Sequence, residues 1–186
     1  SRAHPPLSAY FKQRFAQVTN PPIDALRERQ KTDCSVYLGD DGNLLEPGPD
    51  ACRVLELASP VLTEDALARV RALDLPGFRV ETLTLCYARE DGMERALQAL
   101  FQACDAAYAR GANIVVLSDR GVRADRPALP SLLAVSALEQ YLVRTKKRTA
   151  VSVVIESAEA RDSHQMALLV AYGARAVCPS LAHACV

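Results

Sequence analysis

Hydrophobic and polar positions beyond residue 78 alternate between strand-like and helix-like segments. The expected strands lie at 79–86, 114–117, 151–155 and 176–177. The expected helices lie at about 93–110, 131–144 and 161–172. The run at 114–117 is continuously apolar, which is typical of a strand buried on both faces of a parallel sheet. This order predicts an α/β fold, a parallel β-sheet with right-handed βαβ crossovers.

The first third of the chain carries weaker signals of regular structure. Apolar residues recur at helical spacing over 7–18, which predicts an amphipathic helix. They are Leu7, Tyr10, Phe11, Phe15 and Val18. Prolines at 21 and 22 end this helix, and a second short helix is expected at about 24–30. The sequence from 37 to 46 shows no regular hydrophobic pattern and contains a turn signal at 39–43.

A helix that begins after Thr63 marks the start of the predicted core. Thr63 is a suitable N-cap, acidic residues fill the first turn, and the Pro-Gly pair at 76–77 ends the segment. We therefore expect an α/β core at 63–186 and a helical arm or connector at 1–62, which together form one domain. Because the first methionine is Met93, we expect this domain to be part of a longer chain.

The charge balance argues against two classes of partner. The chain has 22 basic and 22 acidic residues and a formal net charge of zero. Nucleic-acid-binding faces usually show a basic excess, and an anionic membrane attracts the same kind of surface. No stretch approaches 18 uninterrupted apolar residues, and no signal peptide is visible. We expect no nucleic acid, no membrane and a cytoplasmic location.

The six cysteines do not follow the spacing of a metal site. They are Cys34, Cys52, Cys86, Cys104, Cys178 and Cys185. No pair has the C-x-x-C spacing that zinc and iron–sulfur sites use. We expect free thiols in a reducing compartment, some of them buried as small apolar side chains. No metal or cofactor is expected within this chain.

Polar clusters follow two of the predicted strands. Residues 118–121 come directly after the run at 114–117, and residues 156–161 follow the strand at 151–155. Ligands of α/β folds bind outside the carboxyl ends of strands, so these loops form the candidate site. The candidate residues are Ser118, Asp119, Arg120, Glu156 and Arg161.

Two interpretations of these loops are open. In the structural one, Asp119 and Arg120 shape a tight loop, and Arg161 neutralises Glu156 or Glu159. In the functional one, the loops bind or transform a small molecule. Neither loop carries a glycine-rich phosphate motif. The sequence also has no nucleophile elbow and no convincing cysteine–histidine pair, so we expect no catalytic residue in this chain.

Short stretches along nearly the whole chain follow the pattern of a known family. In the first third they are AYFKQRFAQVTNPPID at 9–24, YLG at 37–39, GNLLE at 42–46 and SPVLT at 59–63. Later they are ANIVVLSDRGV at 112–122, PSLLAV at 130–135, ES at 156–157, EAR at 159–161, ALL at 167–169 and YGA at 172–174. In this order they resemble the central domain of the large subunit of glutamate synthase.

This resemblance implies a reduced or partial (βα) barrel and a scaffold role. Family members carry a glutamine amidotransferase domain, this central domain, a barrel that binds FMN and an iron–sulfur cluster, and a C-terminal β-helix. Ammonia released from glutamine reaches the barrel and reacts with 2-oxoglutarate in glutamate synthesis. The implied partners are the amidotransferase and FMN-barrel domains of the same parent chain, and a small electron-transfer subunit is a further candidate. FMN and the cluster are implied to bind outside this chain.

Two functions of other classes stay open from the sequence. A free-standing small α/β enzyme or phosphate-ligand binder would use the loops at 118–121 and 156–161. A stand-alone binding module would use the aromatic stripe of 7–18 as a docking face. Phosphate or flavin binding by the chain alone would favour the first of these.

Overall fold

The computed structural model describes residues 4–12, 18–43, 45–46 and 48–185. The α-helices are α1 (Ala25–Lys31), α2 (Glu64–Arg71), α3 (Gly92–Ala109), α4 (Ser131–Arg144), α5 (Ser163–Ala171) and α6 (Ser180–Ala184). The strands are β1 (Val36–Gly39), β2 (Val54–Leu57), β3 (Val80–Thr84), β4 (Ile114–Ser118), β5 (Ser152–Glu156) and β6 (Ala176–Cys178). Single 3₁₀ turns lie at Leu7–Tyr10, Pro49–Cys52 and Arg89–Asp91.

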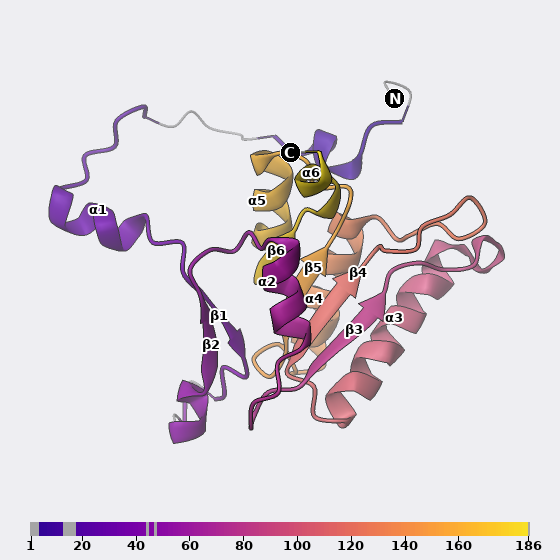
Figure 1. The fold of residues 1–186 in the computed structure, drawn as a ribbon, viewed down its shortest axis with the longest axis horizontal. Helices are drawn as coiled ribbons and strands as arrows, with labels where there is room; N and C mark the ends of the chain where they lie inside the picture. The colour runs from indigo at the N-terminus through magenta and orange to yellow at the C-terminus, as the bar shows by residue number, and fades with distance from the viewer. Residues whose placement is uncertain (1–3, 13–17, 44, 47, 186) are drawn as a thin grey trace.

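A four-stranded parallel sheet forms the centre of the molecule (Figure 1). Its order is β3-β4-β5-β6, so each strand pairs with the next one along the chain. Helices α3, α4 and α5 connect these strands. The predicted α/β fold with a parallel sheet is therefore confirmed. Sequential strand order with connecting helices is also the arrangement of neighbouring units in a (βα) barrel.

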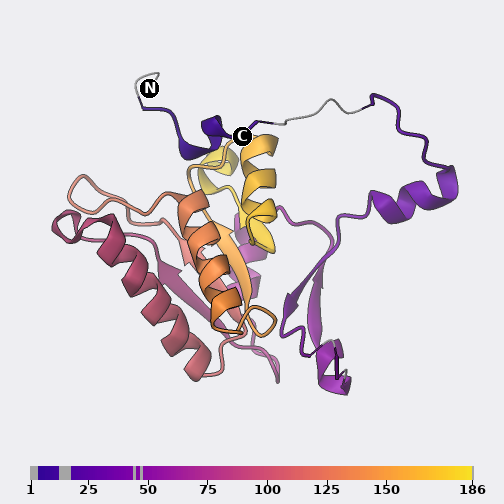
Figure 2. The ribbon, with the colours of Figure 1, turned by 180° about the vertical axis from the view of Figure 1, so that it is seen from behind.

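Separate hydrophobic cores cover the two faces of the sheet. Val115, Leu117 and Ile155 pack with side chains of α3, α4 and α5, which lie side by side on one face in Figure 2. Val116 and Val154 point the other way and pack with α2 and Leu38 of β1. All five residues of β4 are buried. Because both faces are covered, β4 needs apolar residues at consecutive positions, as the sequence predicted.

Capping residues set the starts of two of the helices. Thr63 caps α2 through its Oγ1, which accepts a hydrogen bond from the Ala66 amide at 3.1 Å, as predicted from the sequence. Asp162 plays the same part for α5, accepting from the Gln165 amide at 2.8 Å. The predicted helix at 131–144 agrees with α4 at both ends. Helix α2 precedes β3, α4 connects β4 with β5, and α5 connects β5 with β6, so the positions of these helices fix the loops at the strand ends.

The first two strands form an antiparallel hairpin, whereas irregular structure was expected for residues 37–46. β1 pairs with β2, and Leu38 of β1 is fully buried beneath the sheet. The Ser152 hydroxyl joins this hairpin to β5: it accepts from the Gly39 amide at 3.0 Å and donates to the Gly39 carbonyl at 2.9 Å. The hairpin therefore packs on the sheet, and the boundary between residues 62 and 63 stays a prediction.

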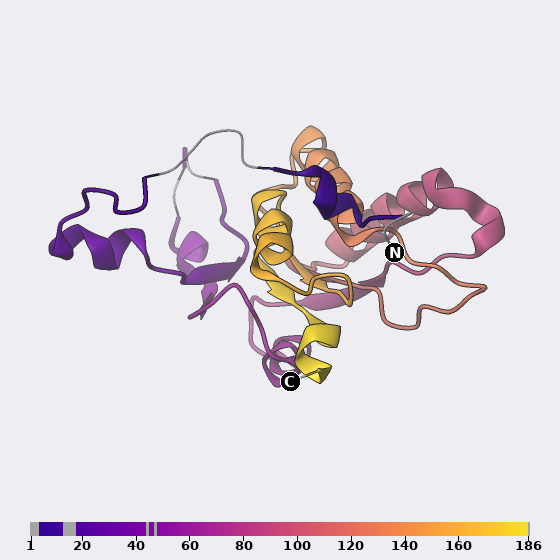
Figure 3. The ribbon, with the colours of Figure 1, turned by 90° about the horizontal axis from the view of Figure 1, so that it is seen from above.

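The N-terminal segment differs from the predicted helix over 7–18. Within the described residues it forms only the 3₁₀ turn Leu7–Tyr10, and Phe11 is extended with φ −94° and ψ 128°. The Phe11 ring packs edge-to-face against Tyr172 of the loop after α5, with ring centroids 5.3 Å apart. Figure 3 shows this segment running alongside the helical layer. Residues 13–17, with Phe15 of the predicted stripe, lie outside the described residues.

Helix α1 confirms the predicted second helix but stands apart from the sheet (Figures 1 and 3). Asp24 caps it by accepting from the Leu26 and Arg27 amides at 3.1 and 2.9 Å. None of its residues is buried, and Leu26 is 92% exposed. The local capping signal thus forms the helix without help from the described core.

The two outer strands of the parallel sheet have different neighbours. Beside β6, the Val177 amide donates to the Pro60 carbonyl at 2.7 Å, and the Leu62 amide donates to the Val177 carbonyl at 2.8 Å. On β3, Glu81 forms ion pairs with Arg110 and with Arg79, the latter at 3.4 Å. No helix of the described residues is long and apolar enough to span a bilayer.

Candidate functional site

The structure brings Ser118 and Glu156 together at the carboxyl ends of neighbouring strands. They are partners in the parallel register of β4 and β5, and both are buried. The Ser118 hydroxyl donates to Oε2 of Glu156 at 2.5 Å. Arg120 lies just beyond β4, and its Nε donates to Oε1 of Glu156 at 2.6 Å.

Glu156 is held as a buried anion by several donors. Its exposed fraction is 1%, and in addition to Ser118 and Arg120 it binds Arg71 of α2, whose Nη2 lies 2.7 Å from Oε2. Burial alone would raise the pKa of this carboxyl, but the hydrogen bonds from Arg71, Ser118 and Arg120 lower the pKa to about 2. Arg120 also donates to Glu64 at 2.5 Å. Glu156 is therefore ionised at neutral pH and fully engaged.

Arg71 is the member of this cluster that the sequence analysis missed. Its partner Glu156 lies 85 positions further along the chain, so no local pattern joins the two. One signal does point to Arg71: it follows the buried Leu67 by four residues on α2 and so shares the face that packs on the sheet. The exposed Arg69 lies off that face.

Asp119 occupies a second polar environment at the same end of the sheet. Its Oδ2 accepts from the Ser157 hydroxyl at 2.9 Å and from the Ala158 amide at 2.7 Å. Burial raises the pKa of Asp119, although these two hydrogen bonds act to lower the pKa. Asp119 thus joins the loop after β4 to the loop after β5, in agreement with the structural interpretation.

Arg161 does not play the part expected in the structural interpretation. Within the described residues it forms no ion pair with Glu156 or Glu159, and its amide donates to Oε1 of Gln165 at 2.7 Å. Oε2 of Glu159 instead accepts from the amide and the hydroxyl of Ser131, at 2.7 and 2.5 Å, and so caps the start of α4. Arg71 and Arg120 neutralise Glu156 instead, because each donates to one of its carboxylate oxygens.

The donor groups of the described chain do not match a metal or iron–sulfur site. No three of its His, Cys, Asp and Glu side chains are grouped as metal ligands. The six thiols are free: Cys86, Cys104 and Cys178 are buried, and Cys34, Cys52 and Cys185 are exposed. Burial raises the pKa of Cys104 and of Cys178 to about 11. Protonated, scattered thiols are poor ligands for a cluster.

An open cavity of about 560 Å³ lies at the carboxyl end of the sheet. Among the five candidate residues, Asp119, Arg120 and Arg161 line it. Ser118 and Glu156 lie outside this lining, in the ion-pair cluster. Arg120 belongs to both features, because it pairs with Glu156 and also lines the cavity, whereas Asp119 and Arg161 line the cavity only.

A family model described as "Glutamate synthase central domain" matches residues 1–186. The chain belongs to this family. Its ion-pair cluster and its cavity are therefore features of a glutamate synthase central domain, which agrees with the resemblance found in the sequence.

Relatives of this central domain are long chains named as glutamate synthases. The large chain of the NADPH enzyme of Bacillus subtilis is 40% identical over 175 residues, which cover 94% of this chain and 11% of the relative. The NADH enzyme of Schizosaccharomyces pombe is 40% identical over 178 residues, covering 93% and 8%. The chloroplastic ferredoxin-dependent enzyme of Spinacia oleracea is 41% identical over 179 residues, covering 93% and 11%. The chain thus spans about a tenth of the length of these relatives.

Proposed function

We propose that this chain is the non-catalytic scaffold domain of a glutamate synthase. It holds a glutamine amidotransferase domain and an FMN and iron–sulfur synthase barrel in register, so that ammonia released from glutamine reaches 2-oxoglutarate. FMN and the cluster are bound by those other domains. The enzyme acts in the cytoplasm, and residues 1–62 serve as the arm through which the core at 63–186 meets its neighbours.

The observation that carries this proposal is the state of Glu156. A general acid or base needs a pKa near the working pH and a free path to its substrate. Glu156 has a pKa of about 2 and is 1% exposed. Both of its carboxylate oxygens accept hydrogen bonds from Arg71, Ser118 and Arg120. Such a group stabilises the strand ends and does not transfer protons at neutral pH.

The exposed helix α1 supports a docking role for the arm. An isolated helix of seven residues is marginally stable in water, because few hydrogen bonds offset the cost of nucleation. The side chain of Leu26 on α1 is 92% exposed. Contact with a neighbouring domain would bury this side chain and lower its free energy. The relatives are about ten times as long as this chain, which leaves ample polypeptide to cover the helix.

The test uses the full glutamate synthase that contains this domain. Glutamine hydrolysis and glutamate formation are measured in parallel. Leu26→Asp should lower the amount of glutamate formed per glutamine hydrolysed while hydrolysis continues, because the charge prevents docking of α1. Leu75→Asp is the control, since Leu75 is also an exposed leucine, at 53%, but lies after α2 in the core and outside the arm. Unchanged coupling in Leu26→Asp would refute the docking role of the arm.

A second variant tests the non-catalytic role of the strand ends. Ser118→Ala removes one hydrogen bond to Glu156 and should cost about 1 kcal/mol of stability. Both half-reactions should continue in the folded enzyme. Loss of either half-reaction in a variant that keeps its fold would show that the strand ends are catalytic, and the scaffold proposal would be wrong.

A further inference from the structure

The cavity at the carboxyl end of the sheet is built from three separate loops. It is lined by the loop after β4 (residues 119–123 and 127–128), by the loop after β5 (Ala158, Glu159 and Arg161) and by Ser180 after β6. Its volume of about 560 Å³ lies within the range of small-molecule sites. Parallel sheets commonly bind ligands at this end, where loops from several strands converge.

The lining of the cavity favours an anion. The two carboxylates in it are engaged with protein donors, Asp119 with Ser157 and Ala158, and Glu159 with Ser131. Arg161 forms no ion pair within the described residues. Arg123 has only a loose one, 3.6 Å from an exposed aspartate, Asp125. Two guanidinium groups in this lining therefore remain available to a ligand.

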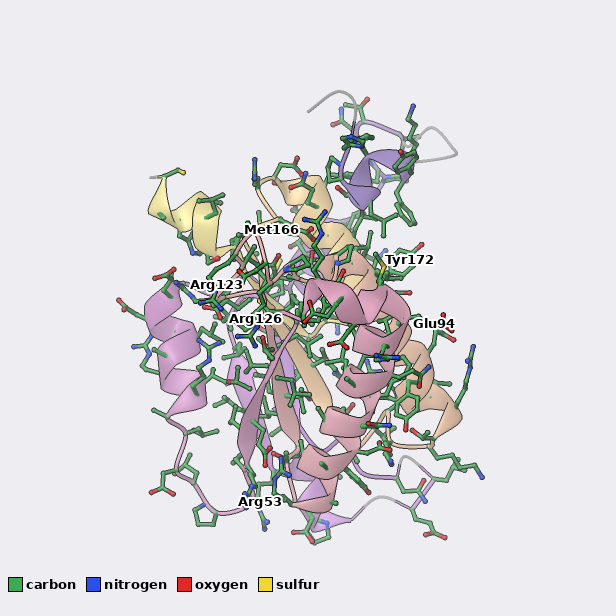
Figure 4. All side chains as sticks on the ribbon, turned by 90° about the vertical axis from the view of Figure 1, so that its right-hand side faces the viewer. Arg53, Glu94, Arg123, Arg126, Met166 and Tyr172 are labelled. Carbon is green, nitrogen blue, oxygen red and sulfur yellow. The ribbon has the colours of Figure 1, made fainter. Side chains whose placement is uncertain are left out.

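The loop that carries Arg123 is held in place by backbone hydrogen bonds. Arg123 and Arg126 each donate an amide to the carbonyl of the other, both at 3.0 Å, and Figure 4 shows the two side by side. The Leu129 amide donates to the Leu85 carbonyl at 2.9 Å, and the Tyr87 amide donates to the Pro127 carbonyl at the same distance. The loop is thus anchored on the segment that follows β3, which lowers the cost of ordering the loop on binding.

Ser180 adds a hydroxyl group to the lining of the cavity. The residue is 9% exposed and lies at the start of α6. A hydroxyl can donate a hydrogen bond to an oxyanion, so Ser180 can assist the two arginines in binding a ligand oxygen.

We propose that this cavity binds a small molecule through a phosphate or carboxylate group, held by Arg123 and Arg161 and by the hydroxyl of Ser180. Guanidinium groups pair with such oxyanions through parallel charge-assisted hydrogen bonds. The proposal is independent of the scaffold role, since a non-catalytic domain can carry a ligand site.

Isothermal titration calorimetry of the full 186-residue chain tests this site, with inorganic phosphate and succinate as probes at constant ionic strength. Arg123→Gln and Arg161→Gln should each weaken binding at least about tenfold, because each removes a charge-assisted pair. Ser180→Ala should weaken binding by a smaller factor. Arg144→Gln is the matched control, since Arg144 is an exposed arginine at the far end of α4, without an ion pair in the described chain. This control should bind as the unsubstituted chain does.

The two probes separate the sources of the oxyanion. Tighter binding of phosphate assigns a phosphate-bearing ligand, and tighter binding of succinate assigns a carboxylate; both support the site. Circular dichroism verifies that each variant is folded, which is expected because Arg123 and Arg161 are exposed. The proposal is overturned if neither probe binds, or if Arg144→Gln weakens binding as much as Arg123→Gln and Arg161→Gln do.

Discussion

Replacing Glu156 by glutamine removes the charge from the buried cluster at the strand ends while keeping its shape. The carboxyl has a pKa of about 2 in the folded chain, compared with an ordinary value of 4.5. This difference corresponds to about 3 kcal/mol of stabilisation of the folded state at neutral pH. Glu156→Gln should lose most of it, because Arg71 and Arg120 then face a neutral side chain.

The pH dependence follows from the lowered pKa of Glu156. A lowered pKa stabilises the folded state above the unfolded pKa, and this contribution disappears as pH falls through the folded value. The difference in unfolding free energy between the unsubstituted chain and Glu156→Gln should therefore be largest above about pH 5. It should fall to about half near pH 3 and vanish only below pH 2.

Urea unfolding followed by circular dichroism measures this difference at each pH. Glu94→Gln is the control, because Glu94 is exposed on α3 and forms no ion pair in the described chain (Figure 4). It should change stability by no more than about 0.5 kcal/mol. The reasoning fails if Glu156→Gln costs no more than Glu94→Gln at pH 7, or if its cost does not decline towards low pH.

Two further predictions concern local exposure. A disulfide reagent should modify the exposed Cys34, Cys52 and Cys185 quickly in the native chain, and the buried Cys86, Cys104 and Cys178 only after unfolding. Burial excludes the reagent and also keeps the thiols of Cys104 and Cys178 protonated. Six equally fast thiols would contradict this prediction. In hydrogen exchange, the amides of α1 should exchange much faster than those of β4, which is buried on both faces; equal protection would mean that the arm belongs to the core.

The sequence predicted the parts of the fold whose pattern repeats locally. The apolar run of β4 and the helical periodicity of α4 each depend on residues close together in the chain. The hairpin β1–β2 was not predicted, because its strands have only four residues each and are joined by a long connection. In addition, Leu38 is buried by contact with a sheet whose strands come much later in the chain. The helix predicted over 7–18 failed for the same reason. Phe11 has an extended backbone and packs against Tyr172, a residue far along the chain that no local pattern could indicate.

The candidate site divides in the same way. The rule that parallel strands end at one edge was enough to place Ser118 and Glu156 together. Their bonding could not be read from the chain, because the cations come from two directions. Arg120 is close in sequence to β4, whereas Arg71 reaches the cluster from α2, 85 positions before Glu156. Local charge favoured Arg161 as the partner of Glu156 or Glu159, whereas within the described residues it pairs with neither.

The ion pairs of Glu81 bear on whether this domain adds to other sheets. An outer strand offers unpaired amides and carbonyls, along which a second copy could extend the sheet without limit. The 60–62 segment occupies this position beside β6. β3 has instead Glu81 between Arg79 and Arg110, so an incoming strand would have to strip water from three charged groups. These charged groups therefore disfavour the addition of a further strand along β3.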